Sequence, residues 1–220
     1  MTESRSFRLV ASAVAGTVLF ATAGMAAASA NSIDDRMPTT PVALAPLKVL
    51  FDGLTPQTVN KYDQYVTTDK NGMFGTSIPD AVALLDGPGT AAVRSAVNQA
   101  NALLRAQQGK QTGEALPGNP LSYETEHGGI SVDWTGVTVW LDGDATAALD
   151  SLLALGATAQ QVLDFLSSNG IALPPGAGPV AGAVAAAVLA LKDRLEECKG
   201  TDGFTLKVTV TGQVTCTPRN

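Results

Sequence analysis

The sequence feature that most constrains the fold is an apolar run in the last quarter of the chain. From Val180 to Leu191 every residue is Val, Ala, Gly or Leu, within a predicted helix from Pro179 to Cys198. Gly178 and Pro179 suit the N-cap and the first turn of that helix. A helix that is apolar on all sides belongs in a protein core or in a membrane. The fold therefore has to cover this hub helix.

The length of the run and the charges that follow it favour a protein core over a bilayer. The uninterrupted apolar stretch is about thirteen residues, whereas a bilayer core requires about 20. Charged residues at 192–194 and 196–197 make the last part of the helix amphipathic. Gly182 and Ala186 are small residues one turn apart, which predicts close packing against another backbone. A membrane helix is the alternative.

Residues 1–30 have the pattern of a secretory signal peptide. Two arginines precede an apolar run over 9–28, and the run ends in Ala-Ser-Ala. This pattern predicts cleavage between Ala30 and Asn31. We therefore expect a secreted, extracellular protein with no stable membrane span after signal removal. An uncleaved membrane anchor is the alternative, because the run is long enough to cross a bilayer.

The charge balance excludes some classes of partner. The net charge is −6 at pH 7. Nucleic-acid binding depends on basic patches, so no nucleic acid is expected as a partner. Attraction to anionic lipid also requires basic residues.

About 190 residues remain after the predicted cleavage, which suits one domain or a domain with an appendage.

Residues 31–46 are predicted to form an extended N-terminal arm. The stretch is polar and rich in proline, so it can bury little apolar surface. The candidate partner-binding residues of the arm are Pro41, Val42, Leu44 and Pro46. An extended segment of this kind can dock on a partner as an added strand. A terminus that stays clear of the fold is the alternative.

Residues 47–109 are predicted to form a small, mainly helical subdomain. Thr55 suits the N-cap of a short helix, and Asn71-Gly72 predicts the turn of a small β-ribbon. A second short helix is expected over 77–85. A clear amphipathic helix follows, capped by Thr90 and running to Gln108.

Residues 110–126 are predicted to be a linker, and residues 127–220 an α+β domain. Four elements are expected around the hub helix, namely a hairpin over 130–141, helices over 145–155 and 158–168, and a hairpin over 203–216. Asp144 suits the N-cap of the first helix, and Thr158 with Gln161 predicts a capping box on the second. The predicted fold class is α+β, with two β-hairpins packed around the buried Ala/Gly-rich helix.

Cys198 and Cys216 are predicted to form a disulfide. An exported chain with two cysteines most simply has one such bond. A zinc site is less favoured, because His127 is the only histidine that could join the cysteines as a ligand. A Cys-x-x-Cys motif, typical of reactive thiol pairs, is absent from the sequence. No metal or cofactor is expected.

The sequence contains no constellation that we assign to catalysis. His127 is not accompanied by a Gly-x-Ser-x-Gly motif. The carboxylates Asp133, Asp142, Asp144 and Asp150 could pair as in a glycosidase. Asp142 and Asp144 are better explained by a turn and a helix cap, and Asp133 by the outer face of a strand. We therefore expect that the protein is not an enzyme.

Four segments carry a resemblance to small exported proteins of Gram-positive bacteria. They are Lys61-Tyr-Asp-Gln-Tyr-Val66, Lys70-Asn-Gly-Met-Phe74, Val97-Asn-Gln-Ala-Asn-Ala-Leu-Leu104 and Gly129-Ile-Ser-Val-Asp-Trp-Thr-Gly-Val-Thr-Val-Trp-Leu141. With its high Ala and Gly content, the chain resembles the adaptor subunit of the umbrella toxin particles of streptomycetes.

That resemblance implies a non-enzymatic linker between a lectin-bearing subunit and a large repeat-bearing toxin. It also implies that the extended arm over 31–46 makes one of the contacts, although no contact residue is matched one by one. The expected function is therefore that of a secreted, adaptor-like, protein-binding component of an extracellular antibacterial toxin complex. A bacteriocin-like membrane-active protein is the alternative, supported by the hub helix.

Overall fold

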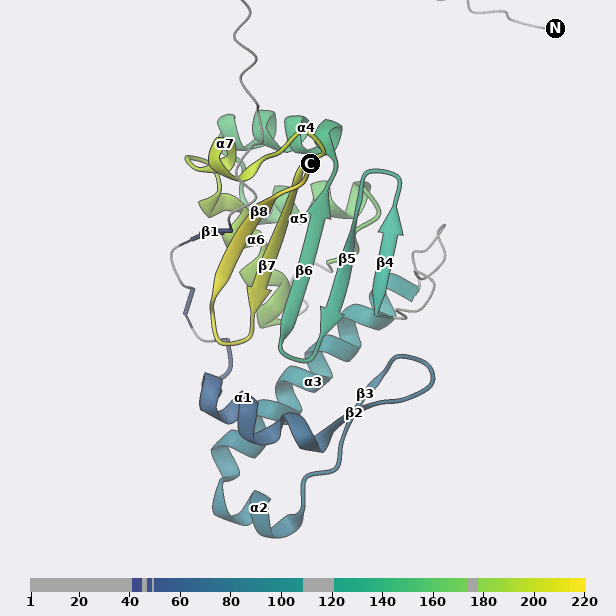
Figure 1. Cartoon of the computed structure of the whole chain (residues 1–220), viewed down its shortest axis with the longest axis vertical. Helices are drawn as coiled ribbons and strands as arrows, with labels where there is room; N and C mark the ends of the chain where they lie inside the picture. Colours follow the sequence, from purple (N-terminus) through teal and green to yellow (C-terminus); the bar gives the residue numbers. More distant parts are fainter. Residues whose placement is uncertain (1–40, 45–46, 49, 109–120, 174–177) are drawn as a thin grey trace, which may run out of the picture. The chain divides into compact units, whose positions relative to one another are not determined.

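The chain folds as an α+β protein around one antiparallel sheet (Figure 1). The structure, a computed structural model, describes residues 41–44, 47–48, 50–108, 121–173 and 178–220. All of these residues belong to one compact unit.

The sheet has six strands in the order β1-β8-β7-β6-β5-β4. They are β1 (Val42–Ala43), β4 (Ser122–Thr125), β5 (Gly128–Asp133), β6 (Gly136–Leu141), β7 (Phe204–Thr209) and β8 (Val214–Pro218). The two predicted hairpins are β5–β6 and β7–β8. They lie side by side in this one sheet, because β6 pairs with β7 and places Val137 opposite Val208.

The strands alternate between a buried face and an open face. The buried face carries Ile130, Val132, Val137, Val139, Leu141, Phe204, Leu206 and Val208. The open face carries mostly Ser and Thr, with Trp140 on β6 and Lys207 on β7. This period of two is the property of a strand that packs on one side only.

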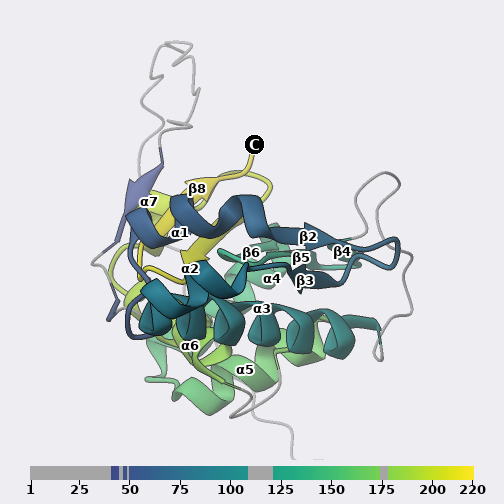
Figure 2. The same cartoon turned by 90° about the horizontal axis from the view of Figure 1, so that it is seen from below.

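The helices that follow β6 in the chain cover the buried face before the chain returns as β7. They are α4 (Gly143–Ala154), α5 (Ala159–Ser168), α6 (Pro179–Ala190) and α7 (Leu195–Cys198), and α3 (Gly87–Gln108) precedes the sheet. Helix α6 packs against β6 and β7, α5 packs against α6, and α3 packs against β5. Figure 2 shows α3, α5 and α6 on the same side of the sheet.

The hub helix is buried, as the sequence predicts, but it is shorter than predicted. Val184, Ala185 and Ala187 are fully buried in α6. The chain turns at 191–194 before α7, so the prediction of one helix to Cys198 is wrong. The turn leaves polar residues outside and returns Leu195 to the core, where it is 1% exposed. None of the described helices is long and apolar enough to cross a membrane.

The close backbone contact predicted for Gly182 is not found among the described residues. A Cβ atom built on Gly182 meets no other heavy atom within 4 Å, and the residue is exposed on α6. The small-residue pair with Ala186 therefore has no packing partner among the described residues at its glycine end.

The segment before α3 forms small elements around a ribbon. They are α1 (Pro56–Tyr62), a 3-10 turn η1 (Asp63–Tyr65), β2 (Val66–Thr68), β3 (Phe74–Thr76) and α2 (Asp80–Leu85). The predicted N-cap Thr55 and the predicted ribbon are confirmed. The Asp69 side chain accepts from the Asn71 and Met73 amides at 2.8 and 2.9 Å, which closes the turn.

Two predicted helix caps are wrong. Helix α3 begins at Gly87 instead of after Thr90, because the Asp86 side chain accepts from the Gly89 amide at 3.0 Å and so takes the capping role. Helix α4 is capped by Asp142 instead of Asp144, with the Ala145 amide donating at 2.7 Å. The capping box at Thr158 is confirmed.

The prediction of a linker over 110–126 is wrong for 122–125, which form the edge strand β4. Tyr123 is 4% exposed, and the Ser122 hydroxyl donates to that of Ser131 at 2.9 Å. The sequence pattern did not indicate a strand here because β4 is short and consists mostly of polar residues. The expected subdomain over 47–109 and the α+β domain share one core through the contact of α3 with β5.

Candidate functional site

The described part of the predicted arm pairs with the chain's own sheet. Val42 lies opposite Cys216 on β8, and the Leu44 amide donates to the Val214 carbonyl at 3.1 Å. Leu44 is 7% exposed, so it packs in the core of this chain. The Arg194 guanidinium donates to the Ala43 carbonyl at 3.0 Å and holds the same segment.

The other candidate residues of the N-terminal region have different positions. Pro41 is exposed at the start of the described segment. Pro46 and the predicted cleavage residues Ala30 and Asn31 lie outside the described residues. Of the candidate arm residues in the described ranges, Pro41 is thus exposed, Val42 is partly buried and Leu44 is buried.

The predicted disulfide is confirmed between Cys198 and Cys216. Their Cα atoms are 5.7 Å apart, and both residues are fully buried. The bond joins α7 to β8, beside the place where β1 pairs with the sheet. It therefore fastens the end of the helical layer to the edge of the sheet.

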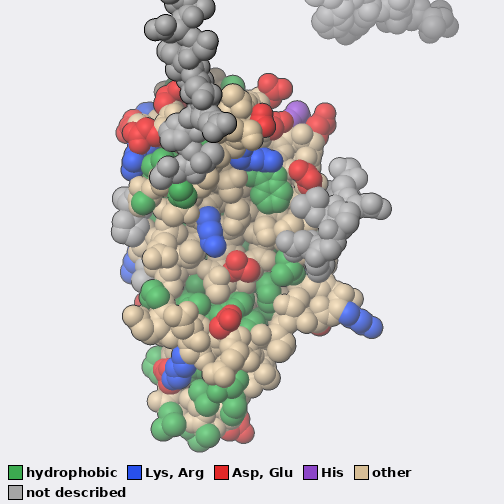
Figure 3. All heavy atoms as spheres, in the orientation of Figure 1, with side chains coloured by type: hydrophobic (Ala, Val, Ile, Leu, Met, Phe, Trp, Pro, Cys, Tyr) green, Lys and Arg blue, Asp and Glu red, His purple; other side chains and the backbone are tan. Residues whose placement is uncertain are grey.

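An exposed apolar surface lies on the short helix α2. Leu84 is 86% exposed and Leu85 is 88% exposed, whereas Val82 and Ala83 on the other side are partly buried against the core. Ala81 is also exposed, and its spacing to the leucines is i, i+3, i+4. We call Ala81, Leu84 and Leu85 the α2 tip. Figure 3 shows hydrophobic side chains gathered at the lower end of the molecule, where Figure 1 places α2.

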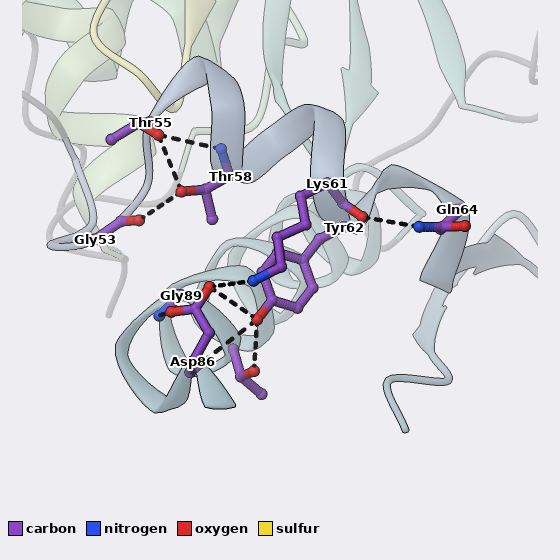
Figure 4. A network of polar contacts seen from close by, with 9 residues as sticks. Gly53, Thr55, Thr58, Lys61, Tyr62, Gln64, Asp86 and Gly89 are labelled. Carbon is purple, nitrogen blue, oxygen red and sulfur yellow. Dashed lines mark hydrogen bonds and ion pairs between the residues drawn. The ribbon is translucent and has the colours of Figure 1, made fainter. Parts of the chain in front are cut away.

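A network of polar contacts holds the residue that follows the α2 tip. The Lys61 ammonium lies 2.8 Å from the Asp86 carboxylate, and the Tyr62 hydroxyl donates to the same carboxylate at 3.2 Å (Figure 4). The hydrogen bond from Lys61, supported by the one from the Gly89 amide, lowers the pKa of Asp86. The same hydrogen bond raises the pKa of Lys61. Asp86 is therefore ionised and paired.

The buried ring of Tyr62 connects this network to α3. Its hydroxyl lies 3.0 Å from that of Thr90, and the tyrosine is 0% exposed. On the other side, the Thr58 hydroxyl donates to the Gly53 carbonyl at 3.0 Å and fixes the start of α1 (Figure 4). The α2 tip therefore extends from a junction of α1, α2 and α3 that side chains hold in place.

Two of the four acidic residues considered for catalysis, Asp142 and Asp133, have structural partners. Asp142 caps α4 and also lies 3.1 Å from Nδ1 of His127. That hydrogen bond raises the pKa of His127. Burial opposes the ionisation of Asp142, but the hydrogen bonds from the Ala145 amide and His127 outweigh it and lower its pKa. Asp133 accepts from the Thr135 amide at 2.6 Å.

Within the described residues, no group of three or more His, Cys, Asp or Glu side chains is placed to hold a metal ion.

Sequence reasoning missed the α2 tip. The spacing of Ala81, Leu84 and Leu85 is the spacing that normally indicates a buried helix face. The length of α2 is the signal that could have identified it. A helix of six residues cannot bury both of its apolar faces, one with Val82 and Ala83 and the other with the two leucines. Which of the two faces is buried depends on the position of α3.

Comparison with family models, with curated proteins and with solved structures finds no match to this chain.

Proposed function

We propose that this chain is a secreted, non-enzymatic, adaptor-like protein that binds other proteins of an extracellular antibacterial toxin complex. The signal-like pattern over 1–30 and the resemblance to umbrella toxin adaptors support secretion and this setting. The disulfide supports an oxidising compartment. The α2 tip is the single observation that carries the protein-binding role.

The α2 tip has the form of a helical anchor for a groove. Leu84 and Leu85 hold large side chains in solvent at 86% and 88% exposure, on a helix whose other face is packed. Helix-in-groove recognition uses anchors at i, i+3 and i+4, the spacing found here. Exposed apolar clusters on folded proteins commonly mark contact sites. The partner is therefore a protein with an apolar groove wide enough for one helical turn.

The junction behind the α2 tip reduces the entropic cost of such binding. The helix is fastened through Asp86, which contacts Lys61, Tyr62 and Gly89. An anchor held before binding loses less conformational freedom in the complex. The resemblance suggests a lectin-bearing subunit or a large repeat-bearing toxin as the protein that supplies the groove.

The burial of α6 speaks against the membrane-active alternative. That alternative required an apolar helix available to lipid, and α6 is covered by β6, β7 and α5. Val184 is 0% exposed and Val188 is 1% exposed. Release of α6 would require opening of the core.

The proposal is tested by pull-down of the tagged full chain from producer culture supernatant, with mass spectrometry of bound proteins. We expect one or more secreted proteins to bind the wild type and to be lost with the double variant L84Q/L85Q. The matched control is L155Q, because Leu155 is equally exposed at 87% and lies at the end of α4.

Three results would contradict the protein-binding role. The first is recovery of the wild type alone at native concentration. The second is equal partner recovery by L84Q/L85Q. The third is dye leakage from liposomes at low protein concentration, which would favour the membrane-active alternative.

A further inference from the structure

A hollow of about 430 Å³ lies at the end of the sheet where β6 leads into α4. Its walls come from the β4–β5 turn, the end of β6, the segment before β7 and the residue after β8. The chain's last residue is labelled C at this end of the sheet in Figure 1. The volume falls within the range of about 300–1,000 Å³ usual for sites that hold small molecules.

Trp140 forms the aromatic wall of this hollow. The strand register places Glu124, Gly129 and Trp140 in one row on the open face. A Cβ atom built on Gly129 would lie 2.2 Å from Cζ2 of Trp140, so the indole covers the glycine backbone and points along the row. Glycine at this position leaves room for the ring to lie flat on the sheet.

The two tryptophans of the chain differ in what their indole N–H groups do. Trp134 is 5% exposed, and its indole N–H donates to the Asp63 carboxylate at 3.0 Å. Trp140 is partly exposed, and its indole N–H has no hydrogen-bond partner among the described residues. Trp134 therefore serves the fold, whereas Trp140 presents an unused donor and a ring to the hollow.

Charged side chains of both signs line the same hollow, and three of them have no side-chain partner in the described part of the chain. The Arg219 guanidinium and the carboxylates of Glu124 and Asp202 make no side-chain hydrogen bond or ion pair with the residues that the structure describes. The Asp142 carboxylate, in contrast, is already hydrogen-bonded to the Ala145 amide in the α4 cap and to His127. The hollow therefore offers free donors and free acceptors around an aromatic face.

This combination selects a class of ligand. The carboxylates of Glu124, Glu126, Asp144 and Asp202 disfavour an anion such as a phosphate or an acidic sugar. A simple cation would suit the carboxylates, but it could not accept from the Arg219 guanidinium or from the indole N–H of Trp140. A neutral sugar meets both conditions, because its hydroxyls both donate and accept hydrogen bonds and the C–H face of a pyranose ring packs on an indole.

We propose that the hollow bounded by Trp140, Glu124, Asp202 and Arg219 is a binding site for a neutral saccharide. One face of the sugar ring lies on the indole of Trp140. Its hydroxyls donate to the two carboxylates and accept from Arg219. The site is separate from the α2 tip and goes beyond the proposed protein-binding function.

The test is a glycan array of neutral and acidic glycans, probed with the full mature chain, followed by calorimetry with the best ligand. We expect neutral glycans to bind and acidic ones to fail. The affinity should fall about tenfold or more in W140A, which removes the stacking surface. It should also fall in D202N, and we expect this variant to fold normally because Asp202 is exposed.

Fluorescence provides a matched control, because the chain has two tryptophans. Bound sugar should shift the emission of the W134F variant, in which Trp140 remains, and should leave that of W140F unchanged. Failure of every neutral glycan to bind would overturn the proposal. So would equal affinity of W140A, D202N and the wild type, or a preference for acidic glycans.

Discussion

His127 shows how one side-chain contact makes the stability of the fold depend on pH. The hydrogen bond and the charge of Asp142 raise the pKa of His127 in the folded chain. A group whose pKa is raised by folding stabilises the fold while it is protonated. Its contribution is fully present below the unfolded-state pKa of about 6.5 and is lost as the pH rises through the folded value.

We therefore expect H127Q to melt at a lower temperature than the wild type at about pH 5, and at nearly the same temperature at about pH 9. Calorimetric melting over this range measures the difference. K207Q is the control, because Lys207 is exposed on the open sheet face and its variant should show no such trend. A difference that grows toward high pH would show that the pair acts in another way.

At the scale of elements, α6 illustrates how the position of a glycine decides its effect. Gly182 lies in the exposed part of the first turns, and an added Cβ meets nothing within 4 Å among the described residues. Glycine inside a helix costs about 0.5–1 kcal/mol relative to alanine. We expect G182A to stabilise the protein by this amount, measured by urea unfolding.

The same substitution at Gly129 supplies the contrast. Its added Cβ would lie 2.2 Å from Trp140 and 2.5 Å from the Tyr123 carbonyl oxygen. Overpacking of this kind costs about 1–3 kcal/mol, so G129A should lower the free energy of unfolding. Destabilisation by G182A would contradict the expected gain, which rests on the open space beside this residue.

At the scale of the whole molecule, the disulfide joins the helical layer to the sheet. It closes a loop with a sequence separation of 18 between fully buried cysteines. A loop of this length is worth about 3 kcal/mol of stability. We expect the C198A/C216A variant to lose this amount, seen as a lower urea midpoint for unfolding.

Hydrogen exchange and reductant distinguish this effect from a general loss of packing. Amides of β8 and β1 should exchange sooner in the variant, since Cys216 pairs with Val42 there. Dithiothreitol should lower the midpoint of the wild type in unfolding experiments and leave the variant unchanged. A wild type with the same midpoint in oxidising and reducing buffer would contradict the expected contribution.

Much of the local structure follows from short stretches of sequence. Thr55 and Thr158 cap helices, and Asn71-Gly72 forms the turn of the ribbon. The alternation of apolar and polar residues predicts the strands β5, β6, β7 and β8. These signals can be read from the sequence because they act between residues a few positions apart. The burial of α6 and the pairing of two cysteines follow from composition. The N-cap of α4 was assigned to the wrong residue because two acidic residues, Asp142 and Asp144, both suit that position.

The sequence by itself thus determined the α+β class, most of the elements, the disulfide and the need for a covered hub helix, but not the edge strand β4 or the break between α6 and α7. Tertiary structure alone decided that both hairpins join one sheet, that Leu44 packs on its own chain, and that Leu84 and Leu85 remain outside. It alone brought Trp140 on β6 and Arg219, which follows β8, to one hollow. The physical reason is that burial and strand neighbours depend on contacts between residues far apart in the chain, which no local pattern encodes.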